Sequence, residues 1–179
     1  MKEKIFLITL ILFSKSAFSE YAISATEILQ MPPFCRGLSI SNFQYDAQKL
    51  RKRVRIPGQH TQHFCHGMKS IIRRQYATAI KEFEYVQQHS TKRHSLIPAT
   101  SLYKAEALGK LGKVNPALEE YYKAIQLKKK YSQAYSRLAS YYIKLNRKSN
   151  AIETVKLGLK YLPHSKTLKK KLKRLQSKK

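Results

Sequence analysis

The clearest pattern in the chain is a set of small and large apolar residues that recurs at a fixed offset between positions 98 and 165. The period is about 34 residues, which is typical of stacked helix–turn–helix units. Within each unit, small residues occupy the positions at which two antiparallel helices must approach closely. The pattern therefore predicts one unit at 98–131 and a second at 132–165. The matching pairs are Ala105 and Ala139, Leu108 and Tyr142, Leu111 and Leu145, Ala117 and Ala151, Tyr121 and Val155, and Ala124 and Gly158.

The segment 63–97 contains a degenerate unit ahead of this pair. Gly67 and Ala79 fit its two close-approach positions, but the step from Ala79 to Ala117 is four positions longer than the step from Ala117 to Ala151. The additional residues are expected in the polar linker 87–96, which has no apolar period. Three stacked units meet the usual minimum for a helical repeat array.

The segment 166–179 predicts a basic capping helix. Leu168, Leu172 and Leu175 recur with helical spacing and form one apolar stripe, and Ser165 is a suitable N-cap residue. Such a helix would cover the exposed end of the last unit, which solenoids require. A basic amphipathic helix is also typical of contacts with a membrane surface or with phosphate groups, and this second interpretation stays open here.

The segment before the first unit, 20–62, is expected to be mostly irregular. A short helix is predicted at 21–30, with Ser24 or Thr26 as its cap. The run Met31-Pro32-Pro33 ends this helix. The chain that follows, as far as the first unit, is interpreted as irregular.

The segment 1–19 has the features of a signal peptide. A basic start is followed by an unbroken apolar run from Ile5 to Phe13 and by the small-x-small sequence Ala17-Phe18-Ser19. A run of this length is too short to span a bilayer. We therefore expect cleavage after Ser19 and a periplasmic or secreted mature protein. The alternative is an uncleaved anchor.

Cys35 and Cys65 are the only cysteines in the chain. In an exported protein an even number of cysteines favours a disulfide. This bond would attach the N-terminal segment to the first unit and would stabilise the fold by about 3 to 4 kcal/mol through chain entropy. Two free thiols and metal ligation are the alternatives. His60, His63 and His66 lie nearby, but they have no acidic partner, so packing or capping is favoured and no metal or cofactor is expected.

The two regular units resemble the tetratricopeptide repeat (TPR), and the second fits best. The first departs from the family pattern at Lys104, where an apolar residue is usual, and at Lys129, where a proline is usual. The resemblance implies an all-α, TPR-like fold of about three helical units. In the second unit, the signature positions are held by Tyr135, Leu138, Ala139, Tyr142, Ala151, Val155, Gly158 and Pro163.

Three short motifs also resemble a group of exported proteobacterial TPR proteins. They are P-P-F-C at 32–35, H-F-C-H-G at 63–67 and E-F-E-Y-V at 82–86. This resemblance implies a class and a compartment. It carries no activity that can be assigned to particular residues.

By resemblance to the TPR, the first helix of each unit lines a concave groove that binds a peptide or partner protein. Lys110, Arg137 and Lys144 would suit an extended segment with acidic groups or a free carboxylate. The pattern does not match the carboxylate clamp of that family. The expected groove residues are Leu102, Tyr103, Glu106, Lys110, Gln133, Ser136, Arg137, Ser140 and Lys144.

The chain is strongly basic, with a formal net charge of +26. From 128 to 179 there are 17 Lys and Arg residues and a single acid, Glu153. Such a charge attracts polyanions and anionic membranes, and the basic run 49–55 is a second candidate contact for phosphate. The alternative function is therefore a polyanion-binding envelope protein that uses its basic C-terminal helix to bind lipopolysaccharide, anionic membrane or DNA. Nucleic acid is the least expected of these ligands for an exported protein.

The sequence gives little support for catalysis. Asp46 is the only aspartate, and no G-x-S-x-G, H-E-x-x-H or phosphate-binding glycine loop is present. The closest carboxylate pairs, Glu82 with Glu84 and Glu119 with Glu120, would point in different directions on a helix. We therefore expect a binding protein without enzymatic activity.

Overall fold

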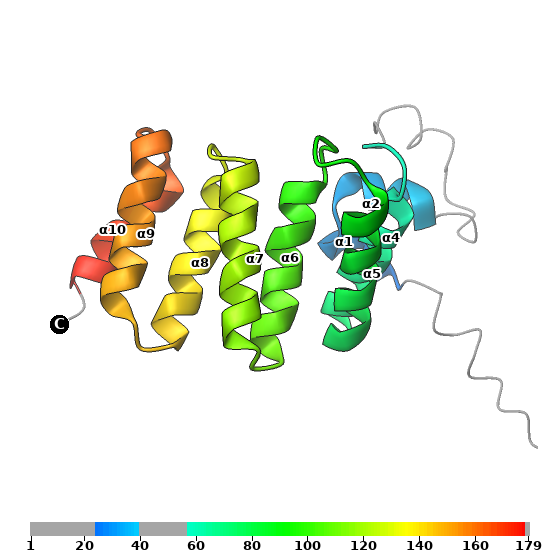
Figure 1. Cartoon of the computed structure of the whole chain (residues 1–179), viewed down its shortest axis with the longest axis horizontal. Helices are drawn as coiled ribbons and strands as arrows, with labels where there is room; N and C mark the ends of the chain where they lie inside the picture. The colour runs from blue at the N-terminus through cyan, green and yellow to red at the C-terminus, as the bar shows by residue number, and fades with distance from the viewer. Residues whose placement is uncertain (1–23, 40–56, 178–179) are drawn as a thin grey trace, which may run out of the picture.

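The computed structural model describes residues 24–39 and 57–177. The expected signal peptide, Asp46 and the basic run 49–55 lie outside these residues. Within the two described ranges, all regular secondary structure is helical (Figure 1). The helices are α1 (Ala25–Gln30), α2 (Pro33–Ser39), α4 (Thr61–Ile72), α5 (Tyr76–His89), α6 (Ile97–Lys110), α7 (Val114–Leu127), α8 (Ser132–Lys144), α9 (Lys148–Tyr161) and α10 (Lys166–Ser177).

Three helical hairpins stack side by side along the long axis of the molecule (Figure 1). They are formed by α4 with α5, α6 with α7, and α8 with α9, and α10 packs against α8 and α9 at the C-terminal end. The second helices of the two regular hairpins begin at Val114 and Lys148, which are equivalent positions of the predicted repeat. The expected all-α repeat architecture is confirmed.

The same turn joins the two helices of every hairpin. Arg74, Gly112 and Asn146 adopt positive φ angles of 59°, 74° and 57°. In each case the amide of the following residue donates to the carbonyl five residues before it, over 2.8 to 3.0 Å. This pattern is the Schellman motif, which satisfies a carbonyl at the end of a helix. The degenerate first hairpin therefore turns in the same way as the two regular ones.

Small residues lie at the helix crossings, as the periodicity predicts. Ala79, Ala105, Ala117, Ala139 and Ala151 are all completely buried. With only a methyl group at each crossing, the paired helix backbones can approach closely while the large side chains pack on either side. The small residues that recur in the sequence are therefore the residues at which the helices of each hairpin contact each other.

In the first hairpin, one crossing position is a glycine. A Cβ atom on Gly67 would lie 2.5 Å from Cε1 of Phe83, whose side chain is itself completely buried. The aromatic ring thus fills the space in which a side chain at position 67 would stand. Gly158 has the same relation to Tyr135, because its Cβ would lie 2.7 Å from Cγ of that ring.

The extra residues of the first unit lie between α5 and α6. The sequence placed the start of this linker at Gln87, but α5 continues to His89. The Gln87 side chain explains the difference, since its Nε2 donates to Ser101 Oγ and to Glu120 Oε2 over 2.9 Å each. A pattern of apolar residues cannot identify a helical position whose side chain is polar and bonds to neighbouring helices.

Lys104 stands at a position where an apolar residue is usual, and it is surrounded by oxygen atoms. Its Nζ lies 3.0 Å from Glu120 Oε1, 3.2 Å from Glu84 Oε1 and 3.2 Å from Gln87 Oε1. Its side chain is only 13% exposed, so the ammonium group needs these partners to offset its loss of water. Because they belong to α5 and α7, the cluster fixes the register of three consecutive helices.

The N-terminal segment begins as predicted and then becomes more regular than expected. Ser24 caps α1, since its Oγ accepts from the Glu27 amide and the Glu27 carboxylate accepts from the Ser24 amide. After Met31, where irregular chain was expected, the short helix α2 begins at Pro33. Proline is well tolerated at the first position of a helix, because that residue needs no intrahelical N–H bond.

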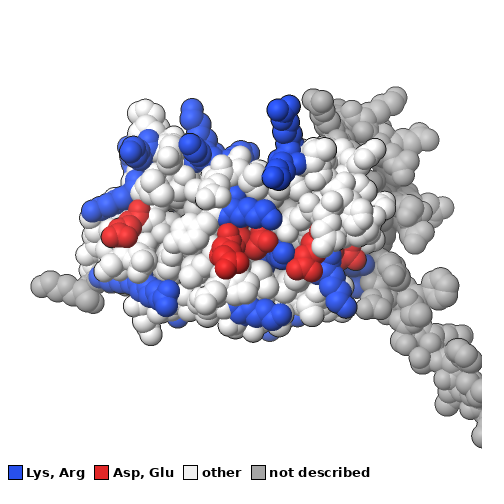
Figure 2. All heavy atoms as spheres, viewed as in Figure 1, with Lys and Arg blue, Asp and Glu red and all other residues white. Residues whose placement is uncertain are grey.

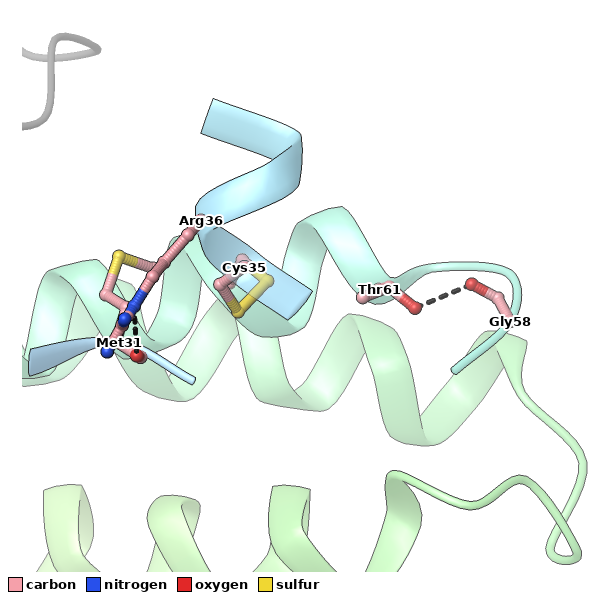
Figure 3. Close-up of a disulfide and its surroundings, with 6 residues drawn as sticks. Met31, Cys35, Arg36, Gly58 and Thr61 are labelled. Carbon is pink, nitrogen blue, oxygen red and sulfur yellow. Dashed lines mark hydrogen bonds between the residues drawn. A yellow bond between two sulfur atoms is a disulfide. The ribbon is translucent and has the colours of Figure 1, made fainter. Parts of the chain in front are cut away.

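A disulfide attaches α2 to α4 (Figure 3). Cys35 and Cys65 are buried, and their Cα atoms are 5.4 Å apart. Beside them, the Arg36 guanidinium donates to the carbonyl oxygens of Met31 and Leu29 over 3.3 and 3.1 Å, which ties α2 back to the end of α1. The predicted pairing of the two cysteines is confirmed.

At the other end of the array, α10 covers the last hairpin. Leu168 is completely buried, and Leu172 and Leu175 pack against the core while remaining partly exposed. The Ser165 hydroxyl accepts from the Leu168 amide over 3.4 Å and so caps the helix. The predicted capping helix is confirmed.

A paired carboxylate provides a second link between α1 and the first hairpin. Arg73 Nε lies 2.6 Å from Glu27 Oε1, and Arg73 Nη2 lies 3.1 Å from Oε2. The Glu27 side chain is only 15% exposed. The hydrogen bond from Arg73 lowers the pKa of Glu27 from its ordinary value of 4.5 to about 2.

Because of this pKa shift, the free energy of unfolding depends on pH under acidic conditions. Because the folded state holds Glu27 ionised, the stabilisation is complete above pH 4.5 and is lost as the pH falls towards 2. We expect Glu27→Gln to lower the free energy of unfolding at neutral pH by about 2 kcal/mol and to flatten its decline over that window. Urea denaturation at a series of pH values measures both effects. Glu119→Gln, which removes an exposed carboxylate, is the control, and equal profiles for the two variants would contradict the assignment.

Candidate binding trough

The two kinds of helix in the array carry different charges. The first helices of the hairpins, α4, α6 and α8, contain Glu106 as their only acid, and α10 contains none. Figure 2 shows acidic side chains in a band across one face, over α9, α7 and α5, with Lys and Arg around them. The acids of these second helices are Glu82, Glu84, Glu119, Glu120 and Glu153.

A cavity of about 330 Å³ opens between α6 and α8, and we call it the trough. Its buried floor includes Ala107, Tyr121 and Tyr141, and Ile71 and Tyr76 of the preceding hairpin close one side. Five of the expected groove residues lie together along it, which are Glu106, Lys110, Arg137, Ser140 and Lys144.

Within the trough, Arg137 is already engaged by the protein. Its guanidinium forms an ion pair with the Glu106 carboxylate and lies 4.9 Å from the centre of the Tyr103 ring. Both charged side chains are about one-third exposed or less, at 31% for Arg137 and 26% for Glu106. A ligand therefore meets a neutralised pair at this point, and Lys110 and Lys144 are the other two cations that line the trough.

The floor of the trough is uncharged. Burial, followed by the negative charge of Glu106, raises the pKa of the Tyr121 phenol above its ordinary value, and burial raises the pKa of Tyr141. Both groups therefore remain protonated at neutral pH. The trough offers an aromatic floor between two lysines.

The other expected groove residues lie outside the cavity. Leu102 is completely buried and belongs to the core, so its assignment to the groove was wrong. Tyr103 is partly buried and packs against Phe83, with ring centres 6.4 Å apart. Gln133 accepts from the Tyr131 hydroxyl over 3.3 Å. The carbonyl oxygen of Ser136 accepts from Lys171 Nζ of α10 over 2.6 Å.

A second and larger hollow, of about 840 Å³, lies between α8 and α10, and we call it the cleft. It shares Ser140 and Lys144 with the trough, so the two are adjacent. The C-terminal helix supplies Lys171, Arg174 and Leu175 to its lining. The sequence pattern predicted that this helix is basic and amphipathic. It did not predict that the helix shares a cleft with α8.

The fold can be compared with known proteins. No protein-family model and no curated protein matches the sequence. Among solved structures, the Sgt2 TPR domain from Aspergillus fumigatus superposes with a TM-score of 0.57 and 22% sequence identity over 68% of this chain and 80% of that domain. The APC/C hetero-tetramer Cut9–Hcn1 gives a TM-score of 0.58 and 19% identity, covering 83% of this chain and 26% of that one. The fold is that of a TPR array.

At the N-terminal end of the TPR array, histidine and tyrosine side chains form a stack of rings. The rings of His63 and His89 both stack on Tyr85, with centres 3.8 and 3.9 Å from it, and the ring of His60 lies 5.5 Å from Tyr85. Glu82 Oε2 lies 2.8 Å from His63 Nδ1, which corrects the expectation that these histidines have no acidic partner. Among the described residues, no three His, Cys, Asp or Glu side chains have the geometry of a metal site.

The helices of the array are short and rich in polar residues. None of the described helices is long and apolar enough to cross a membrane.

The ion pair in the trough can be tested by a double-mutant cycle on the free energy of unfolding. Because both groups are partly removed from water, we expect Glu106→Gln and Arg137→Gln to show a coupling energy of about 1 kcal/mol. The matched control replaces Lys110, which lies one helical turn after Glu106, and its coupling to Glu106 should be about 0.3 kcal/mol or less. Urea denaturation of the variants measures both cycles. Equal coupling in the two would show that Arg137 is not specifically paired.

Proposed function

We propose that this protein is an exported, non-catalytic TPR module that holds an extended segment of a partner protein in the trough. The observation that carries the proposal is the cavity between α6 and α8, in which an aromatic floor lies between the cations Lys110 and Lys144. Such a site suits a segment that combines an apolar side chain with acidic groups. The similar solved structures support the fold; one of them, Cut9–Hcn1, is itself a hetero-tetramer.

Export is supported by two independent features. The first is the leader pattern at 1–19, with its basic start and apolar run. The second is the buried Cys35–Cys65 disulfide, because structural disulfides persist mainly in oxidising compartments. Together they favour the periplasm or the exterior.

A role without catalysis is supported by the ion pairs that most of the described acidic residues form. Glu27, Glu84, Glu106 and Glu120 lie in ion pairs with Lys or Arg, and Glu82 pairs with His63. Carboxylates held in this way contribute to structure and are poorly placed for proton transfer to a substrate.

A peptide-library selection tests the proposed binding site. The mature chain is purified from the periplasm, where an N-terminal Glu20 is expected, and is used to select displayed random peptides. Enriched peptides should combine acidic residues with an aliphatic or aromatic side chain. Lys110→Glu combined with Lys144→Glu should weaken their binding about tenfold or more, because attraction becomes repulsion.

The control for this experiment is Lys156→Glu combined with Lys160→Glu. These two exposed lysines lie on α9, and the change in net charge is the same. Binding by the control should equal that of the unmodified chain. The proposal fails if no peptide is enriched or if both double variants lose binding to the same extent.

A second candidate function is binding of a polyanion by the surface of α10. It is favoured by the exposed residues Lys169, Lys170 and Lys173, together with the absence of any acid from α8 and α10. Binding of heparin, used as a soluble polyanion, should then weaken steeply as salt is added. Replacing the three lysines by glutamine, which leaves the apolar side of α10 unchanged, should reduce that slope by about 2 to 3. A salt-independent affinity would eliminate this function.

A further inference from the structure

The cleft between α8 and α10 has the size of a small-molecule site. Its volume of about 840 Å³ lies within the range of about 300 to 1,000 Å³ that is usual for ligand pockets. It lies mainly between α8, to which Ile143 belongs, and α10, to which Leu175 belongs, and the turn residue Asn146 and the first residue of α9, Lys148, also line it. Helix walls have little backbone left for hydrogen bonding, so recognition in the cleft depends on side chains.

One part of the cleft is apolar. Ala139, Ile143 and Leu175 all line it. Ile143 is 40% exposed, and Leu175 is only partly buried against the core. A hydrocarbon group placed here would remove both side chains from water.

The lining of the cleft is also cationic and contains no carboxylate among the described residues. Its basic residues are Lys144, Lys148, Lys171 and Arg174. Lys171 Nζ donates to the carbonyl of Ser136 and to Oγ of Ser140, so two of its three donors are used and its position is set by α8. Burial, followed by the charge of Arg174, lowers the pKa of Lys171, and a bound anion would offset that cost.

We propose that the cleft binds a single-chain anionic amphiphile, with an acyl chain against Ile143 and Leu175 and a carboxylate or phosphate head group at Lys171 and Arg174. The charge complementarity and the apolar wall lie within one cavity, so that one molecule of this class meets both. The occupant is a monomeric lipid anion such as a fatty acid. This goes beyond the proposed function, because Ile143, Lys171 and Arg174 do not line the trough.

Two other occupants make different demands. A polyanion would need only the charges, which α10 already presents on its exposed surface, and would make no use of Ile143. An extended peptide would need hydrogen-bonding partners along its whole backbone. The lining offers three uncharged polar side chains, Ser140, Asn146 and Ser177, and Ser140 already accepts from Lys171. The combination of a hydrocarbon surface with cations that have no carboxylate beside them in the cleft favours the amphiphile.

Calorimetric titration of the full mature chain with dodecanoate, below its micelle concentration, tests the proposal. We expect saturable binding of one molecule per chain. Decanoate and octanoate should bind progressively more weakly, by about fourfold for each methylene that the cleft buries. Dodecyl maltoside, with the same chain and no charge, and butanoate, with the same head group and a short chain, should each bind at least about tenfold more weakly than dodecanoate.

Two variants locate the site. Ile143→Glu places a carboxylate on the apolar wall and should weaken dodecanoate binding at least about tenfold, and Arg174→Gln should weaken it several-fold. Leu157→Glu is the matched control, because Leu157 is a similarly exposed aliphatic residue, at 45%, on α9 and outside the cleft. Circular dichroism verifies that all three remain helical.

Several results would overturn the proposal. They are absence of saturable dodecanoate binding, equal affinity for dodecanoate and dodecyl maltoside, and equal weakening by Ile143→Glu and Leu157→Glu. Peptide selection with the Lys110 and Lys144 variants is read separately. If the unmodified chain binds peptides but not dodecanoate, the cleft assignment is refuted; if it binds dodecanoate but enriches no peptide, the proposed function of the trough is refuted.

Discussion

The structure depends on the close approach of paired helices at residues that have almost no side chain. At Gly67 the partner is the ring of Phe83, and at Gly158 it is the ring of Tyr135. At other crossings of the regular hairpins the residues are Ala105, Ala117, Ala139 and Ala151, which are completely buried. Each hairpin contacts only its neighbours in the stack. The distance between paired helices is therefore set within each hairpin, and the stack needs no contacts between distant parts of the chain.

This constant step determines where ligands can bind. When hairpins stack in register, their first helices come side by side, and the side chains between them form a trough whose floor is the aromatic core itself. The acids lie mainly on the second helices, where Glu84 and Glu120 neutralise Lys104. Towards the C-terminal end, α8 and α10 contain no acids, so positive charge is concentrated beside an open hollow. Acidic residues are therefore concentrated on the side of the array formed by the second helices, and the cleft lies on a side that is mainly basic.

Much of the fold could be predicted because the residues at helix crossings and turns recur in the sequence at a regular spacing. The crossings at Ala105 and Ala139 and the capping helix are examples. The pairing of Cys35 with Cys65 was predicted separately, from the presence of two cysteines in a chain with an export signal. Polar contacts across helices have no such regular spacing. The role of Lys104 depends on Glu84 and Glu120, which come from two different helices, and the apolar pattern alone cannot reveal it.

The candidate site was predictable only in part. The resemblance to the TPR indicated which residues of the first helices line the groove, and five of the expected residues line the trough. Spacing could not reveal that Leu102 turns into the core, that Glu106 engages Arg137, or that Lys171 reaches Ser136 from another helix. Each of these facts depends on the distance between helices, which is a property of the packed hairpins.

The disulfide shows how the two ends of the molecule differ. It joins residues 30 positions apart, and both lie at or before the first helix of the first hairpin. Among the described residues of the loop that it closes, none lies at a crossing between hairpins. Reduction would therefore leave α1 and α2 held to α4 by noncovalent contacts alone, whereas α6 and α8, on either side of the trough, contain no cysteine. The direct effect of a change in redox conditions is therefore expected at the flank formed by α1, α2 and α4.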